Sequence, residues 1–102
     1  MGVVERLNVG IVGACGRGAE LGSVFAHLRH ARVHAVCDVV PEPLHEVALR
    51  CGGAEEYLEY EEMLARSALD AVIVATPMPL HIPQAVAALE QGFHVLSEVP
   101  AG

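Results

Sequence analysis

Three glycines, Gly13, Gly16 and Gly18, fall within six residues between an apolar run and an amphipathic segment. In that context, backbone N–H groups and the positive end of a helix dipole can bind a pyrophosphate. We expect Gly13 to permit a tight turn and Gly18 to let the helix pack against the strand. Cys15 replaces the central glycine of G-x-G-x-x-G, and Gly16 could give the same close approach if the turn shifts by one residue. An ordinary strand-to-helix turn is the alternative.

A carboxylate, Asp38, lies 20 residues beyond Gly18 at the end of the second apolar run. This spacing is typical of the carboxylate that accepts hydrogen bonds from the adenosine ribose of a bound dinucleotide. No Arg or Lys follows in Val39-Val40 to neutralise a 2′-phosphate, so the sequence favours NAD over NADP. A turn aspartate ahead of Pro41 is the alternative interpretation.

Other polar residues indicate less. Arg17 is the only cation inside the glycine turn, where it could screen a phosphate or lie in solvent. His27, His30 and His34 are close in sequence, but a helix end and a strand start separate them and no carboxylate or cysteine completes a ligand set. We therefore expect no metal site. No Ser-His-Asp or paired-carboxylate arrangement indicates hydrolysis, and no catalytic residue can be named.

The elements that must position these residues follow from alternating hydrophobic periods. Strands are expected at residues 7–12, 33–37, 71–75 and 94–97, with a weak edge strand between 53 and 57. A brief helix is expected near Tyr60, and Gly52 is placed to cap the helix before it. Pro83 is expected in the first turn of the last helix. The three longer helices would bury Leu21, Val24, Phe25 and Leu28; Leu44, Val47, Ala48 and Cys51; and Ile82, Ala85, Val86 and Leu89.

Strands alternating with helices predict repeated βαβ units in a single α/β domain over residues 1–102. Right-handed crossovers favour a doubly wound parallel sheet in the order 3-2-1-4-5. Such sheets bind ligands beyond the carboxyl ends of their strands, where the winding reverses. Gly13, Asp38, Thr76 and Glu98 each stand at such an end, so we expect them to share one site.

Composition narrows the class of protein. The chain has 102 residues, of which 53% are hydrophobic and 4% aromatic, which suits a parallel sheet covered on both faces. A net charge of −7 with six Lys and Arg argues against nucleic acid or an anionic membrane as partner. Three cysteines without a C-x-x-C pattern or a signal peptide favour a reduced, cytoplasmic protein. The glutamates from Glu55 to Glu62 are expected on a solvated surface.

The sequence resembles the N-terminal domain of the Gfo/Idh/MocA family of oxidoreductases along nearly its whole length. The similarity rests on the order and spacing of the segments VGIVG at 9–13, VCD at 36–38 followed by Pro41-Glu42, YEEML at 60–64, DAVIVATP at 70–77 with His81, AALEQGFHVL at 87–96, and EVP at 98–100. The resemblance implies a Rossmann fold. It also implies that Thr76, Pro77 and His81 line the nicotinamide side of the cofactor and that Glu98 approaches the nicotinamide ribose.

The resemblance departs from the family pattern at Val99. The family usually reads Glu-Lys-Pro there, and its lysine assists proton transfer at the reacting carbon, which valine cannot do. The chain also ends before the mostly β domain that supplies the family's catalytic aspartate and histidine and its oligomer interface. We therefore do not expect the isolated 102 residues to be catalytically complete.

The sequence as a whole predicts the NAD(P)-binding domain of an oxidoreductase that acts on a sugar, polyol or related hydroxy compound. By the same resemblance, the small-molecule substrate would be bound only together with a second domain, and a homo-oligomer is expected. Two alternatives remain: a nucleotide-binding sensor or assembly module without catalysis, and an inactive truncated fragment with an exposed apolar sheet edge.

Overall fold

The structure, a computed structural model, describes residues 7–16 and 30–97. Its strands are β1 (Leu7–Val12), β2 (Ala31–Cys37), β3 (Glu55–Tyr57), β4 (Ala71–Val74) and β5 (His94–Ser97), and its helices are α2 (Pro41–Arg50), α3 (Tyr60–Arg66) and α4 (Met78–Glu90). The expected helix at 21–28 lies outside the described residues, as do Arg17, Gly18, His27, Glu98 and Val99.

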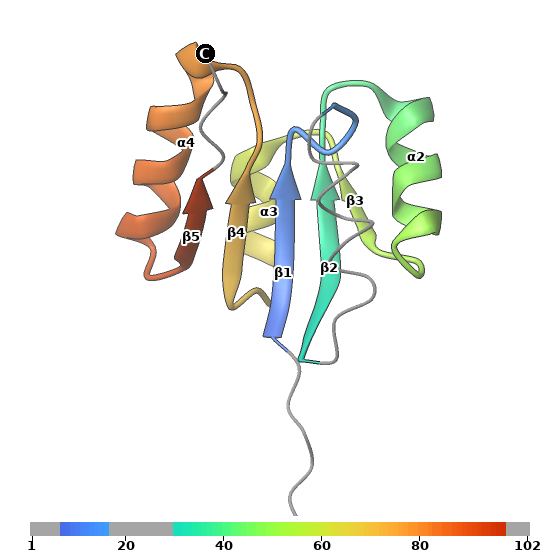
Figure 1. Ribbon diagram of the computed structural model, residues 1–102, viewed down its shortest axis with the longest axis horizontal. Coiled ribbons are helices and arrows are strands. Elements are labelled where there is room, and N and C mark those ends of the chain that lie inside the picture. The colour runs from blue at the N-terminus through green and yellow to red at the C-terminus, as the bar shows by residue number, and fades with distance from the viewer. Residues whose placement is uncertain (1–6, 17–29, 98–102) are drawn as a thin grey trace, which may run out of the picture.

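The five strands form one parallel sheet in the order β3-β2-β1-β4-β5, which confirms the doubly wound topology. All the arrows point the same way in Figure 1, so the carboxyl ends of the strands meet at one edge of the sheet. The chain moves outward from β1 to β3 and then crosses back to β4. The winding therefore reverses between β1 and β4, where such sheets bind their ligands.

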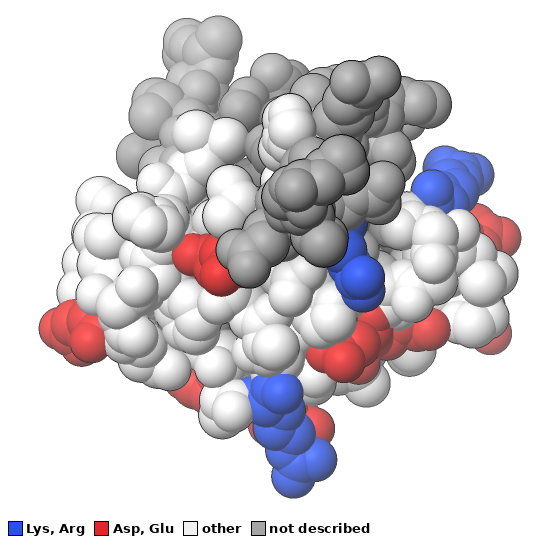
Figure 2. All heavy atoms as spheres, turned by 90° about the horizontal axis from the view of Figure 1, so that it is seen from below, with Lys and Arg blue, Asp and Glu red and all other residues white. Residues whose placement is uncertain are grey.

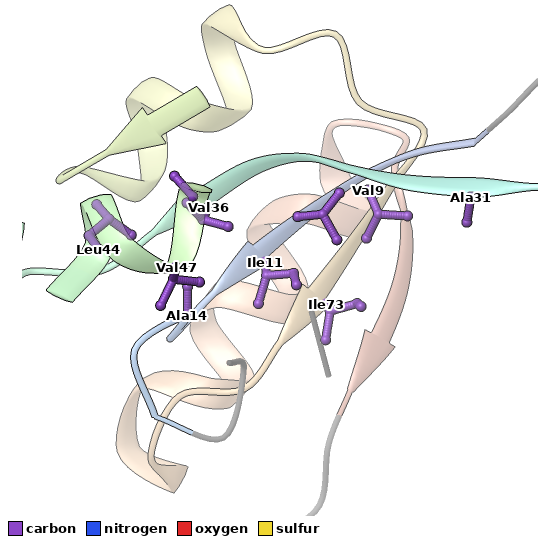
Figure 3. Packing of buried hydrophobic residues seen from close by; sticks show 10 residues of the cluster. Val9, Ile11, Ala14, Ala31, Val36, Leu44, Val47 and Ile73 are labelled. Atoms are coloured by element: carbon purple, nitrogen blue, oxygen red, sulfur yellow. The ribbon is translucent and has the colours of Figure 1, made fainter. Parts of the chain in front are cut away.

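Apolar side chains cover both faces of the sheet. On one face, α2 packs Leu44, Val47 and Ala48 against β2 and β3, in the same apolar cluster as Ile11 and Ile73 of the central strands (Figure 3). On the other face, α3 supplies Met63 and Leu64, and α4 supplies Ala88. Residues 9–12 of β1 and 72–74 of β4 are buried, and these stretches are continuously apolar, as the sequence predicted for central parallel strands.

Most element positions agree with the sequence, and the boundaries differ by a few residues. β1 spans the expected range, whereas β2 begins at Ala31 because Ala31 pairs with Leu7. β4 ends at Val74, one residue early. Gly52 follows α2 with φ of 86°, a left-handed conformation that glycine adopts without strain and that agrees with the expected cap. Cys51 is partly buried beside the core.

The last helix differs from the prediction in start and orientation. α4 begins at Met78, so Pro83 lies inside the helix and Pro79 takes the early position that tolerates the missing N–H. Ala88 is buried, but Ile82 and Leu89 are about 60% exposed (63% and 59%). The helix is apolar on more than one face, so periodicity alone could not select the inner one. In the described ranges, no helix has the length and apolar composition that crossing a membrane requires.

A short polar network attaches the edge strand β3 to its neighbours. Glu55 accepts hydrogen bonds from the buried Ser67 hydroxyl at 2.7 Å and the Tyr57 hydroxyl at 2.9 Å. His34 Nε2 of β2 lies 3.7 Å from the same carboxylate, and His34 Nδ1 accepts a hydrogen bond from the Arg32 guanidinium at 2.9 Å. The Ser67 hydrogen bond is the main cause of a pKa of Glu55 below its usual value. One of the expected surface glutamates therefore also has a structural role.

We expect Glu55→Gln to lower the free energy of unfolding near pH 7. The neutral amide accepts weaker hydrogen bonds from the Ser67 and Tyr57 hydroxyls than the carboxylate does, and it loses the electrostatic attraction to His34. A carboxylate with a lowered folded pKa contributes stability above its unfolded pKa of about 4.3, and that contribution disappears as the pH falls through the folded pKa. Urea denaturation at about pH 7 and about pH 3 measures it. The difference between wild type and variant should narrow in acid; a constant difference would contradict the assignment. Glu61→Gln is the control.

Candidate functional site

A pocket of about 410 Å³ opens at the carboxyl ends of β1, β2 and β4. Its position is the place where the sheet reverses its winding. Most of its wall is apolar, and four side chains bring polar groups to it: Asp38, Tyr60, Thr76 and Gln84. The remaining lining residues are Val12, Gly13, Gly16, Cys37, Val39, Leu58, Ala75, Pro77 and Leu80.

Gly13 brings the end of β1 against the end of β4. Its φ of 81° lies in the left-handed region, and a Cβ added there would meet the Ala75 carbonyl carbon and oxygen at 2.8 Å. Backbone atoms cannot move aside as a flexible side chain can, so only glycine fits. Gly16 contrasts with it, because an added Cβ there meets no atom of the described residues within 4 Å. The open space beside Gly16 belongs to the pocket.

The N–H groups of the glycine turn are already used within the protein. Those of Gly13 and Ala14 donate to the Cys37 carbonyl at 3.0 and 3.2 Å, and that of Gly16 donates to the Gly13 carbonyl at 3.3 Å. The Cys15 N–H donates to Asp38 Oδ2 at 2.9 Å. In the described part of the turn, the N–H groups of residues 13–16 thus each donate to a protein acceptor, and the residues after Gly16 lie outside the described ranges.

Asp38 connects the second strand to the glycine turn at the pocket wall. Oδ2 accepts the Cys15 N–H, and Oδ1 accepts the Val39 N–H at 2.7 Å. A carboxylate has about four lone-pair positions, so both oxygens keep capacity for further donors. The side chain is partly exposed and lines the pocket. Two N–H groups thus fix the orientation of Asp38, and its remaining acceptor capacity is available to a ligand.

Both cysteines beside Asp38 stay protonated. Burial, and then the charge of Asp38, raise the pKa of the Cys37 thiol to about 12. Burial, the Asp38 charge and a hydrogen bond to Asp38 also raise the pKa of the Cys15 thiol. A protonated thiol is a weak nucleophile and carries no charge. Cys15 therefore places no negative charge in the turn where a phosphate is expected.

Gln84 links the ends of three elements at the other side of the pocket. The Thr76 hydroxyl donates to Gln84 Oε1 at 2.5 Å, and the Tyr60 hydroxyl donates to the Gln84 backbone carbonyl at 2.7 Å. Burial, with a smaller effect of Cys37, raises the pKa of Tyr60 to about 12, so this hydroxyl keeps its proton. The sequence analysis missed Gln84 and Leu58 as site residues, since neither lies in a recognisable motif.

The described cations lie away from this pocket. They are Arg32, Arg50 and Arg66, and none of them lines it. Figure 2 shows the molecule from below, at the amino ends of the strands, with blue and red side chains on that face. Arg66 pairs with Glu62 at 3.6 Å. Within the part of the chain that the structure describes, the pocket therefore has one carboxylate and no positive side chain.

The structure brings five of the predicted site residues together in the pocket: Gly13, Gly16, Asp38, Thr76 and Pro77. Cys15 lies beside it, bonded to Asp38. His81 belongs to the early part of α4, and its side chain is outside the description. Arg17, Gly18 and Glu98 also lie outside the described residues, so their roles stay predictions.

Residues 7–101 match the family described as the Gfo/Idh/MocA oxidoreductase family, NAD-binding Rossmann fold. The chain belongs to this family. The match covers all five strands, and it confirms the resemblance on which the sequence analysis relied. The chain is thus the NAD-binding Rossmann domain of a Gfo/Idh/MocA oxidoreductase.

The relatives of this Gfo/Idh/MocA domain include glycosyl hydrolases. The chain is 35% identical over 107 residues to a glycosyl hydrolase family 109 protein of Saccharopolyspora erythraea, covering 96% of this chain and 23% of the relative. It is 31% identical over 109 residues to an α-N-acetylgalactosaminidase of Shewanella oneidensis, covering 95% of this chain and 23% of the relative. The chain thus spans about a quarter of the length of these relatives.

Solved structures of the family superpose closely. Scyllo-inositol dehydrogenase from Lactobacillus casei with NAD(H) and scyllo-inositol gives a TM-score of 0.82 at 30% identity, over 91% of this chain and 28% of that one. The WlbA dehydrogenase from Bordetella pertussis with NADH and UDP-GlcNAcA gives a TM-score of 0.80 at 33% identity, over 91% of this chain and 29% of that one. A 3-ketoreductase from Actinomadura kijaniata with NADP gives a TM-score of 0.84 at 28% identity, over 94% of this chain and 31% of that one. Family members thus occur with either cofactor.

Gly13 and Gly16 offer a matched pair of substitutions. We expect Gly13→Ala to lower the free energy of unfolding by about 2 kcal/mol or more, because alanine is strained at positive φ and would collide with the Ala75 backbone. Gly16→Ala should change it by less than about 0.5 kcal/mol, because its Cβ enters open space. Gly16→Ala should instead weaken nucleotide binding, because the added methyl group fills part of the pocket beside Gly16. Urea denaturation and calorimetric titration with NAD test both; equal stability of the two variants would contradict this account.

Proposed function

We propose that the pocket binds the adenosine half of NAD. The observation that carries this proposal is the fixed orientation of Asp38, whose oxygens each hold one backbone N–H and keep capacity for the ribose hydroxyls. Val39, Leu58 and Leu80 supply apolar walls for a flat base. The shape and the chemistry of the pocket thus fit a nucleoside, and the family match supports the same ligand.

The rest of the cofactor would extend across the carboxyl ends of the strands. We propose that Arg17 and Gly18 lie at the pyrophosphate, because the described part of the turn has used its own N–H groups. Thr76 and Pro77 line the same pocket as Asp38, so we place them at the adenosine half and not at the nicotinamide side that the resemblance implies. His81 and Glu98 would lie at the nicotinamide side, with Glu98 approaching the nicotinamide ribose. NAD would supply hydride transfer, while this domain binds and orients it.

We propose that the chain prefers NAD to NADP. The ribose 2′-position would lie beside Asp38, whose negative charge repels a 2′-phosphate. Val39 and Val40 follow it, and neither can neutralise that phosphate. The preference rests on these residues, because structures similar to this chain contain NAD or NADP.

The activity of the protein that contains this domain is a separate proposal. The similarity to an inositol dehydrogenase and a sugar-nucleotide dehydrogenase supports oxidation of a sugar, polyol or related hydroxy compound. Such a substrate would be bound together with a second domain, since the chain spans only about 30% of those structures (28% and 29%). Assembly as a homo-oligomer also stays a prediction.

A glycoside hydrolase is the second candidate. Relatives at 31% and 35% identity are named as an α-N-acetylgalactosaminidase and a glycosyl hydrolase family 109 protein. Hydrolysis leaves substrate and cofactor at their original oxidation states, so a hydrolase that holds NAD would accumulate no NADH.

Calorimetric titration with NAD and NADP tests the cofactor proposal. We expect saturable NAD binding and weaker NADP binding, because Asp38 repels the 2′-phosphate. Asp38→Ala should weaken NAD binding by about tenfold or more, since a charge-assisted hydrogen bond is lost. The same variant should narrow the difference in affinity between NAD and NADP. Glu42→Ala, an exposed carboxylate in the first turn of α2, is the control. Equal binding of NAD by wild type and Asp38→Ala would refute the role of Asp38.

Substrate assays separate the two activities. The protein that its gene encodes is incubated with NAD and either an inositol or p-nitrophenyl α-N-acetylgalactosaminide. A dehydrogenase forms NADH in proportion to the alcohol consumed, whereas a hydrolase releases nitrophenol without net NADH. NADH formation with the inositol and no nitrophenol release would exclude the second candidate.

A further inference from the structure

The carboxamide of Gln84 is held in one orientation at the pocket wall. The side chain is partly buried and lines the pocket. Its Oε1 accepts the Thr76 hydroxyl at 2.5 Å, which fixes the side chain, and its backbone carbonyl accepts the Tyr60 hydroxyl at 2.7 Å, which fixes the main chain. The second of these bonds comes from a hydroxyl whose pKa is raised to about 12. Gln84 is therefore positioned from both α3 and the end of β4.

The Gln84 carboxamide keeps donors and an acceptor that the Thr76 hydrogen bond does not use. Because Oε1 is the atom bonded to Thr76, Nε2 keeps both of its N–H donors, and Oε1 keeps a second lone pair. Among the described residues, the Thr76 hydroxyl is the only group bonded to this carboxamide. The pocket walls nearby include Val39, Leu58 and Leu80, which offer it no polar partner. A partly buried amide in such a wall is expected to gain a polar partner from a ligand.

We propose that Gln84 determines specificity for adenine, and this inference rests on the proposed binding of NAD. A carboxamide matches adenine with two hydrogen bonds: its oxygen accepts from the exocyclic amino group, and its N–H donates to a neighbouring ring nitrogen. Hypoxanthine and guanine carry a carbonyl oxygen in place of that amino group. Their oxygen would face Oε1, so two acceptors would oppose each other. Gln84 therefore favours an adenine dinucleotide over its hypoxanthine analogue.

Thr76 is the second part of this recognition. An unrestrained carboxamide can rotate by 180° and exchange its oxygen and nitrogen. Its N–H would then donate to the hypoxanthine oxygen and its oxygen would accept from the neighbouring N1–H, so hypoxanthine would also be matched. The Thr76 hydroxyl opposes that rotation by donating to Oε1. The side chain at position 76 thus fixes which edge of the carboxamide meets the base, and Gln84 makes the contact.

The test is calorimetric titration of the 102-residue chain with NAD and with nicotinamide hypoxanthine dinucleotide. We expect wild type to bind NAD about tenfold more tightly, the usual effect of one such pair of hydrogen bonds. Gln84→Leu removes both hydrogen-bonding atoms at similar size, so the ratio of the two dissociation constants should fall to about one, mainly through about tenfold weaker NAD binding. Gln91→Leu, at an exposed glutamine that ends the same helix, should keep the wild-type ratio.

A second variant separates contact from folding. Gln84→Glu keeps the shape and can still accept from Thr76, but it has no N–H for the ring nitrogen, so NAD binding should weaken while circular dichroism and the melting temperature stay close to wild type. Equal affinity of wild type for both dinucleotides, or an unchanged preference in Gln84→Leu, would overturn the role of Gln84 and leave NAD binding intact. Failure of wild type to bind either dinucleotide would overturn the cofactor proposal together with this one.

Discussion

The close contact between Gly13 and the end of β4 is the constraint on which the rest of the site depends. A Cβ at Gly13 would lie 2.8 Å from the Ala75 carbonyl, so the two central strands can end side by side only if this residue is glycine. The contact places the glycine turn over β4 and leaves the space beside Gly16 open. Thr76 follows Ala75 directly, so the same contact also sets the position of a hydroxyl in the pocket wall.

Asp38 shows how one side chain can serve both the fold and the ligand. It accepts the Cys15 N–H and thereby ties the end of β2 to the glycine turn, which satisfies a donor that would otherwise lack a partner. The same bond sets the direction of the carboxylate before a ligand arrives. A ligand then meets a group that has already lost its rotational freedom, so less conformational entropy is lost on binding.

The sequence predicted the strands, their order and five of the thirteen residues that line the pocket, because these depend on local signals. Apolar runs, the left-handed Gly13 and the distance from Gly18 to Asp38 can each be read from neighbouring residues. Gln84 could not be found in this way, since its importance comes from contacts with Tyr60 and Thr76, which are 24 and 8 residues away. The prediction of which face of α4 is buried was wrong for a related reason. Small alanines allow close packing on the sheet, while Ile82 and Leu89 remain exposed.

An acidic chain with no described cation in its pocket must bind a cofactor anion by other means. The net charge is −7, and the N–H groups of residues 13–16 donate to protein acceptors. We therefore propose that attraction for the phosphates comes from the residues after Gly16, where the sequence predicts the start of a helix and where Arg17 would add a positive charge. Protonated cysteines help here, because a thiolate at Cys15 would add a second negative charge beside Asp38. The proposed binding mode thus divides affinity from selectivity: attraction for the phosphates would come from the turn, whereas Asp38 and Gln84 would distinguish among nucleosides at the strand ends.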